Sequence, residues 1–304
     1  MDNIHIKNII IFWRQTMKKI IAMILVAIMA FGCVSAFAAC APAKDPNTLV
    51  MATNAAFPPY EYKEGDGYAG IDIEIATAIA NKLGMKLEIA DIDFGAIIGG
   101  VETGKYDFGM AGLTVTPERM EQVNFSTSYA TGVQVIIVKE GSNITSLDDV
   151  FTFDADGNPT GLNPDVVNVD KFKVGVQQDT TGDIYCSFGF EDWGFNTCDA
   201  DGNIKIDRVE RFKTGADAVA ALKNGQVDMV IIDNEPAKSF VAANEGEVKI
   251  LESGEYIVEE YAICVNKENN ALLKQINEAL AALKADGTID KIIAKYINDG
   301  SSAE

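Results

Sequence analysis

Short apolar stretches alternate with helical patterns along most of the chain. One helical stripe, closed by Gly84, is formed by Ile71, Ile75, Ile79 and Leu83. Towards the C-terminus, residues 270–297 read as two amphipathic helices that are broken at 286–288, after an apolar strand pattern at 261–267. Strands that alternate with helices in this way predict βα units and mostly parallel sheets.

Two regions of the sequence repeat one order of elements. Residues 95–112 and 215–233 each read as a short amphipathic helix, a glycine stop, an aspartate and a short apolar strand. Upstream of them, residues 49–57 and 173–181 both run from an apolar strand into a polar loop. The duplication predicts two similar α/β lobes. Because open α/β sheets bind ligands beyond the carboxyl ends of their strands, we expect these strand ends to line a cleft between the lobes.

The segment "GLTVTPER" at residues 112–119 poses an electrostatic problem. Thr116 reads as a helix N-cap, which places Arg119 in the first turn of the helix. The start of a helix carries a partial positive charge, so a cation there is unfavourable. An anion held jointly by the helix start and the guanidinium group would resolve the conflict. The alternative is a surface arginine paired with a neighbouring glutamate.

The composition narrows the chemistry. The chain has 304 residues, enough for two ordinary domains, and its net charge of −20 argues against a nucleic-acid partner. Its only histidine is His5, which lies in an expected leader. Histidine-dependent nucleophilic catalysis and histidine-ligated metal sites are therefore excluded from the exported protein, and we expect no metal and no cofactor.

Residues 1–39 have the layout of a secretory signal peptide. Lys18 and Lys19 precede the apolar run from Ile20 to Phe31, and small residues follow it. We expect Met17 to be the true start. The alternative for the apolar run is a retained membrane anchor.

The end of this leader allows two processing routes. "FAAC" at residues 37–40 resembles a bacterial lipoprotein box, which would place a lipid on Cys40 and leave residues 40–48 as a polar tether. Cleavage at the A-x-A pattern of residues 36–38 would instead release a soluble protein. We favour the lipoprotein, and either route exports the chain.

Three cysteines follow Cys40. Cys186 and Cys198 flank a loop-like segment and could form a disulfide in an exported protein, although two unpaired thiols are the alternative. Cys264 lies in an apolar strand pattern, which predicts a core residue.

Several segments between residues 48 and 297 together resemble one protein family. They include "ATNAAFPPYEY", "GYAGIDIEIATAIANKLG", "DFGAIIGGVETGKYDFGMAGLTVTPERMEQVNFSTSY", "VGVQQDTTG" and "VDMVIIDNEPA". In this order they resemble the extracellular substrate-binding proteins of polar amino acid ABC importers, the family 3 solute-binding proteins related to glutamine- and histidine-binding proteins.

The resemblance implies a two-lobed α/β fold of the type II periplasmic-binding-protein kind. Each lobe would be a mostly parallel sheet flanked by helices, with a hinge between the lobes. Lobe 1 would comprise residues 45–139 plus 262–304, and lobe 2 residues 140–256. The chain would cross between them near residues 139–141 and 257–261.

The resemblance also implies which residues hold the backbone groups of an amino acid. Arg119 matches the arginine that grips the α-carboxylate, and Asp233 matches the acid that pairs with the α-ammonium group. Thr114 matches a hydroxyl residue that contacts the same groups, and Gly112 presents main chain there. Lobe-2 residues whose hydroxyl and N–H groups reach the carboxylate are matched by Thr180 and Thr181. Alternatively, Asp233 could simply cap the following helix, and the two threonines could form only a turn.

Other positions would surround the ligand side chain. Phe57 and Phe94 match aromatic walls, although both could be plain core residues, and Asn54 and Gln177 fall where relatives tune specificity. Several cationic- and glutamine-binding relatives carry an acid where this chain has Asn54. We therefore expect a neutral polar or small amino acid, although Asp179 could supply the missing charge.

Lobe 2 carries two enlarged loops, at residues 151–170 and 186–206. Both contain "DADGN", which resembles the start of a calcium-binding loop. The later acidic ligand is not at EF-hand spacing, so we expect a tight hairpin turn in each.

The sequence thus predicts a bacterial binding protein and not an enzyme. It would act outside the cytoplasm as a monomer held to the membrane by a lipid anchor, close on a free L-amino acid, and deliver it to the permease subunits of an ABC importer. Two alternatives use the same fold. One is a free-standing ligand sensor, and the other is a dehydratase-like enzyme, which would need a poised acid or base in the cleft.

Overall fold

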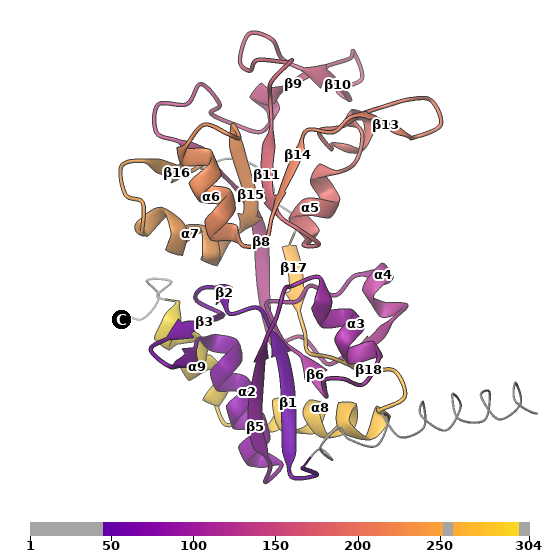
Figure 1. Cartoon of the computed structure of the whole chain (residues 1–304), viewed down its shortest axis with the longest axis vertical. Helices are drawn as coiled ribbons and strands as arrows, with labels where there is room; N and C mark the ends of the chain where they lie inside the picture. Colours follow the sequence, from indigo (N-terminus) through magenta and orange to yellow (C-terminus); the bar gives the residue numbers. More distant parts are fainter. Residues whose placement is uncertain (1–44, 252–257, 298–304) are drawn as a thin grey trace, which may run out of the picture. The chain divides into compact units, whose positions relative to one another are not determined.

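The computed structural model describes residues 45–251 and 258–297. The expected leader, the lipoprotein box with Cys40 and the first part of the tether lie outside these residues. The described residues from Asn47 onwards form one compact unit with two α/β lobes, each built on its own sheet (Figure 1). Among the described helices, none is both long enough and apolar enough to cross a membrane.

The sheet of lobe 1 has the strand order β5-β1-β6-β18-β7. Its strands are β1 (Thr48–Thr53), β5 (Lys86–Asp91), β6 (Phe108–Gly109), β7 (Val123–Phe125) and β18 (Cys264–Asn266). Strand β1 is parallel to β5 and β6, whereas β18 is antiparallel to β6 and β7. The chain therefore returns to the lobe-1 sheet near its end. A separate small sheet contains β2 (Ala56–Phe57), β3 (Glu61–Glu64) and β4 (Gly67–Ala69).

Helices cover both faces of this sheet. They are α2 (Ile71–Lys82), α3 (Ala96–Glu102), α4 (Pro117–Met120), α8 (Asn270–Ala285) and α9 (Thr288–Tyr296). Because side chains alternate along a strand, Met51 of β1 packs in the cluster that contains α2, α8 and α9, whereas Ala52 packs with Ile97 of α3. The predicted helix at residues 71–83 and the helix break at 286–288 are confirmed.

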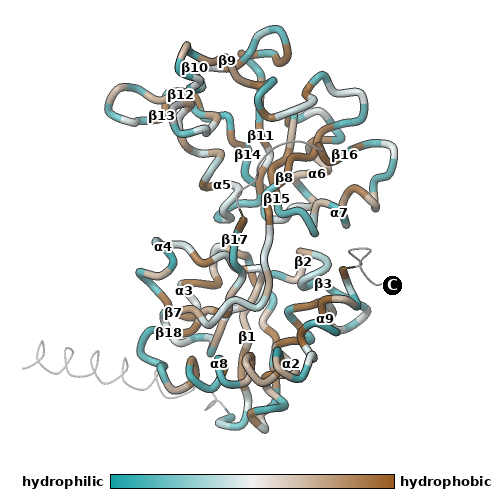
Figure 2. The backbone as a smooth tube through the Cα atoms, turned by 180° about the vertical axis from the view of Figure 1, so that it is seen from behind, coloured by the Kyte–Doolittle hydropathy of each residue, from teal (hydrophilic) through white to brown (hydrophobic). Residues whose placement is uncertain are grey.

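The sheet of lobe 2 has the order β14-β11-β15-β8-β16. Its strands are β8 (Ala130–Lys139), β11 (Val174–Gln177), β14 (Val209–Phe212), β15 (Met229–Asp233) and β16 (Val248–Ile250), and its helices are α5 (Thr181–Cys186), α6 (Gly215–Lys223) and α7 (Asn234–Ala242). Strand β11 is parallel to β14 and β15, and β8 is antiparallel to β15 and β16. The apolar run of β8, brown in Figure 2, alternates between the two faces: Ile137 packs with α6 and α7, and Ile136 packs towards α5.

The two enlarged loops form hairpins on lobe 2. Their elements are η1 (Asp148–Val150), β9 (Phe151–Phe153), β10 (Pro159–Leu162), η2 (Phe190–Asp192), β12 (Thr197–Cys198) and β13 (Ile204–Ile206). In the two "DADGN" turns, the carboxylates of Asp154 and Asp199 accept hydrogen bonds from backbone N–H groups of their own turn. Within the described residues, no cluster of His, Cys, Asp or Glu side chains is arranged to hold a metal ion. The structure therefore contains the hairpin turns that the sequence favours.

The lobes are connected through paired strands rather than through loops. Residues 130–133 of β8 pair with β17 (Val258–Tyr261), and residues 134–139 of the same strand already belong to the lobe-2 sheet. The first crossing thus lies before residue 134, and the predicted crossing at 139–141 is wrong. One continuous apolar strand pattern gives no sign in the sequence of where the chain passes from one lobe to the other.

The cysteines of the described residues are free thiols. Cys186 is buried in the apolar cluster of lobe 2, where burial raises the pKa of its thiol, and Cys198 is half-buried in β12. The structure thus contains the unpaired alternative rather than a disulfide between them. Cys264 is a buried core residue of the lobe-1 sheet, as its strand pattern predicts.

Candidate functional site

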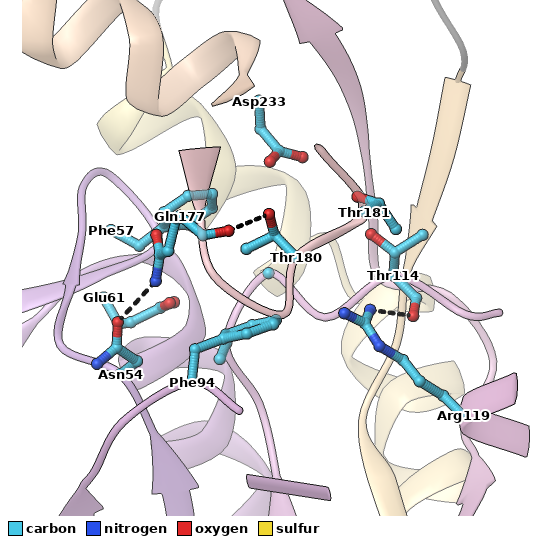
Figure 3. Close-up of a pocket in the computed structure, with 12 residues that line it drawn as sticks. Asn54, Phe57, Glu61, Phe94, Thr114, Arg119, Gln177, Thr180, Thr181 and Asp233 are labelled. Atoms are coloured by element: carbon cyan, nitrogen blue, oxygen red, sulfur yellow. Dashed lines mark hydrogen bonds between the residues drawn. The ribbon is translucent and has the colours of Figure 1, made fainter. Parts of the chain in front are cut away.

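One pocket is lined by residues of both lobes, and Figure 3 shows its side chains. Every residue that the sequence singles out as ligand-binding lines it: Asn54, Phe57, Phe94, Gly112, Thr114, Arg119, Gln177, Thr180, Thr181 and Asp233. Glu61 and Ala111 also line it and were not predicted. Asp179 is not among the lining residues, so the carboxylate that could have replaced an acid at position 54 does not face the pocket.

Arg119 is held in place by the short helix α4. The Thr116 hydroxyl accepts the N–H of Arg119 as an N-cap, as predicted, and the arginine is only 8% exposed. Its guanidinium group donates to the carbonyl oxygen of Thr114 at 2.8 Å and to that of Asp179 at 3.1 Å, and it lies over the ring of Phe94. Burial lowers the pKa of Arg119, which the nearby negative charge of Glu259 opposes. The alternative of a surface arginine is therefore wrong.

Asp233 lies where β15 ends and α7 begins. Its carboxylate makes no capping bond to α7, so the alternative of a simple helix cap is wrong. Instead, the hydroxyl of Tyr261 donates to it. Burial raises the pKa of Asp233 to about 7, and the charge of Glu259 adds to this effect. The carboxyl group is thus poised to change its charge when a cation approaches.

Gly112 adopts a left-handed conformation with φ 53°, and a Cβ atom there would lie 3.0 Å from the ring of Phe57. The left-handed backbone and this close approach together favour glycine. The N–H of Gly112 donates to Asp72 at 2.9 Å, and the hydroxyl of Tyr129 donates to the same oxygen at 2.8 Å. Burial raises the pKa of Asp72 to about 6, although both donors oppose it. The N–H of Gly112 is therefore engaged inside lobe 1.

The hydroxyl groups of the two lobe-2 threonines are also engaged. Thr180 donates to the carbonyl oxygen of Gln177 at 2.7 Å and caps α5 by accepting the N–H of Asp183. Thr181 donates to Glu259 at 3.0 Å. Both hydroxyl groups thus donate within the protein, whereas we expected them to reach a ligand carboxylate. Apart from the capped N–H of Asp183, the backbone N–H groups in the first turn of α5 remain for that role, because no carbonyl group within the helix accepts from them.

Polar contacts join the lobes around the pocket. The side-chain amide of Gln177 donates to Asn54 at 3.1 Å, and Asn54 in turn donates to the carbonyl oxygen of Ile92 at 2.8 Å. At the rim, Lys213 of lobe 2 pairs with Asp93 of lobe 1 at 3.1 Å. The lobes therefore meet in this structure, and Asn54 is held in a network of amide groups.

Glu61 is the charged residue of the pocket that the sequence did not predict. It is fully buried, no N–H group of the described residues donates to its carboxyl oxygens, and its neighbour is the carboxyl group of Asp72, with which it can share a proton. Burial, together with the neighbouring charge of Asp72, raises the pKa of Glu61 well above its usual value. Figure 3 shows Glu61 on the same side of the pocket as Asn54 and Gln177, away from Arg119. The pocket thus has a guanidinium group at one end and a buried carboxyl group at the other.

Comparison with known proteins identifies the class. Residues 49–299 match the model of the bacterial extracellular solute-binding proteins, family 3, and the chain belongs to this family. It is 28% identical over 292 residues to the arginine-binding extracellular protein ArtP of Bacillus subtilis (strain 168), covering 92% of this chain and 98% of ArtP. It is 29% identical over 261 residues to a probable histidine-binding protein of Neisseria gonorrhoeae, covering 85% and 86% of the two chains.

A solved structure of an ancestral arginine-binding protein bound to arginine has the same fold. The two chains are 37% identical, with a TM-score of 0.68 over 83% of this chain and 98% of the other. The expected two-lobed type II fold is thus confirmed. The protein is an amino-acid-binding component of an ABC importer, and the family places it outside the cytoplasm.

Proposed function

We propose that this protein closes its lobes on a free L-amino acid with a cationic side chain, foremost L-arginine, and delivers it to a membrane permease. The observation that carries the proposal is Glu61, a buried carboxyl group in the pocket that lies beside the carboxyl group of Asp72 and has no N–H donor among the described residues. A guanidinium group would supply that donor, because it matches a carboxylate in both charge and shape. The arginine-related names of similar proteins support the same choice.

The rest of the pocket suits the common part of an amino acid. A zwitterion needs one fixed cation and one fixed anion, and Arg119 and Asp233 offer these from different lobes. Phe57 and Phe94 offer apolar walls for the methylene groups between the two ends. Asn54 gave reason to expect a neutral ligand, but Glu61 supplies a second acidic position that the sequence alone did not place in the pocket.

The experiment is a ligand panel on protein that lacks the leader and has been unfolded and refolded to remove bound ligand. L-arginine, L-lysine, L-histidine, L-cystine and L-glutamine would be tested by isothermal titration calorimetry. We expect arginine to bind at least about a hundredfold more tightly than glutamine, since a buried charged pair is at stake. Tighter binding of glutamine would restore the neutral ligand class, and no binding of any amino acid would remove the proposal.

Binding should weaken in acid. The α-ammonium group pairs with ionised Asp233, so each binding event below the pKa of about 7 must release a proton from it. The affinity contributed by this pair is complete above pH 7 and falls roughly tenfold per pH unit below it. Calorimetry at pH 8, 7, 6 and 5 measures this slope, and Asp233→Asn should lose it.

The pH series also shows whether Asp233 alone accounts for the pH dependence of binding. Glu61 and Asp72 also have raised pKa values, so any slope that persists in Asp233→Asn belongs to them. An affinity for arginine that is equal at pH 8 and pH 6 in the unmodified protein would contradict the pairing of Asp233 with the α-ammonium group.

We also propose that the protein acts as a monomer tethered through a lipid on Cys40. The lipoprotein-like "FAAC" motif supports the tether, and the fold begins only a few residues later at β1. Metabolic labelling with a fatty acid tests it: label should appear in the full-length protein and be lost in Cys40→Ser. Persistence of label in this variant would exclude Cys40 as its site.

A further inference from the structure

A second buried carboxylate lies behind the pocket. Glu259 belongs to β17, one of the two strands that connect the lobes, and is only 2% exposed. A single carboxylate oxygen accepts hydrogen bonds from Thr114 at 2.8 Å, Thr181 at 3.0 Å and Gln134 at 3.3 Å. These donors come from lobe 1, from lobe 2 and from the other connecting strand. Since all of them donate to it, this oxygen of Glu259 acts here purely as an acceptor.

This arrangement fixes the direction of the Thr114 hydroxyl group. A threonine hydroxyl has one hydrogen and two lone pairs. The hydrogen of Thr114 points to Glu259, so the hydroxyl presents only lone pairs to the pocket that it lines. A group that Thr114 contacts in the pocket must therefore be a donor. In a zwitterion the donor is the α-ammonium group, and the α-carboxylate would be repelled.

We infer that Glu259 is a positioning residue that makes the pocket selective for a free α-amino group, by holding the Thr114 hydroxyl as an acceptor towards the ligand. The inference rests on the proposed function, the binding of a free amino acid. It concerns the α-ammonium group alone and so applies whichever side chain the ligand carries. Asp233 would supply the charge for that group, and Thr114, oriented by Glu259, would supply the adjoining neutral acceptor.

The test compares two probes that differ only in the α-amino group, L-arginine and 5-guanidinopentanoate. Dissociation constants for both would be measured by calorimetry, with displacement titrations for the weaker probe. Glu259→Gln retains the shape of the side chain but can turn an N–H group towards Thr114, which frees the hydroxyl hydrogen to face the pocket. We expect arginine to weaken by roughly thirtyfold and the deaminated probe by less than about threefold, so that the ratio of the two constants falls about tenfold.

Two further variants separate positioning from general damage. Glu260→Gln removes the same charge from the next residue of β17, whose side chain is exposed, and should leave both constants within about twofold. Thr114→Val removes the hydroxyl itself. If Glu259 acts through Thr114, then Glu259→Gln in the Thr114→Val background should change arginine binding by less than about threefold.

Equal weakening of both probes by Glu259→Gln, no change in either, or effects of Glu259→Gln and Thr114→Val that multiply would each overturn the inference. If the protein prefers another amino acid, that amino acid and its deaminated analogue replace the two probes. The assignment of arginine would then fail, while the ratio of the dissociation constants of the two new probes still decides the role of Glu259. If the unmodified protein binds no amino acid, the proposed function fails before any variant is compared, and this inference falls with it.

Discussion

Replacement of Arg119 by alanine should weaken amino acid binding by roughly a thousandfold, because it leaves the ligand α-carboxylate in the pocket without its cation. Truncating one partner of a buried, hydrogen-bonded charge pair costs about 2–5 kcal/mol, and about 4 kcal/mol corresponds to this factor. Arg119 is only 8% exposed, and two carbonyl oxygens already orient its guanidinium group. Calorimetry with L-arginine and with L-glutamine measures the loss, which should be similar for both ligands.

Two variants control for charge and shape. Arg119→Lys retains the positive charge but not the forked geometry, and should fall between the unmodified protein and Arg119→Ala. Lys291→Ala removes one positive charge from the exposed surface of α9 and should leave binding within about twofold. Unchanged affinity in Arg119→Ala, with the thermal unfolding transition intact, would show that the α-carboxylate is held elsewhere.

The positions of the charges connect binding to closure. Arg119 reaches the pocket from lobe 1, and Asp233 reaches it from lobe 2. A ligand that bridges them interacts fully only when the lobes meet, and such a difference in contacts is what shifts a population towards the closed state. The Arg119 guanidinium group already donates to Asp179 of lobe 2, so the residue that would grip the ligand also contributes to the contact between the lobes.

The part of the site that could be predicted from sequence is the part carried by local patterns. The Thr116 cap and the proline after it define the start of α4, and a cation in that first turn required an explanation. Asp233 could be placed at a strand end because an apolar run of β15 precedes it. The helices α2, α8 and α9 follow from apolar periodicity and their glycine stops.

The two buried glutamates could not be predicted in this way. Glu61 and Glu259 are two of 45 acidic residues in the chain. Nothing in the sequence around them distinguishes them from acidic residues on a solvated surface. Glu61 becomes buried because β3 folds over α2, and Glu259 because β17 pairs with the connecting part of β8. The second contact is long-range and the first depends on how β3 folds back on α2, so burial and charge coupling become visible only in the folded chain.

Replacement of Glu61 by glutamine should change the ligand class. The variant keeps the shape of the side chain but cannot carry the negative charge that a guanidinium group requires. We expect arginine to bind roughly a hundredfold more weakly, a loss of about 3 kcal/mol, while glutamine binding changes by less than about threefold. Parallel titrations with the two amino acids measure the ratio, which a general loss of folding would not alter in this direction.

The matched control is Glu64→Gln, at the exposed end of the same strand β3, which should leave the preference unchanged. The buried neighbour Asp72 provides the opposing explanation, because its carboxyl group lies close enough to share a proton with Glu61. If that pairing were the whole role of Glu61, Glu61→Gln would affect arginine and glutamine alike, or only the unfolding transition. A selective loss of arginine binding in Glu61→Gln would instead mean that the carboxyl group of Glu61 gives up its shared proton when it receives the ligand cation. Arginine binding to the unmodified protein at pH 7 should then release more protons than Asp233 alone can supply.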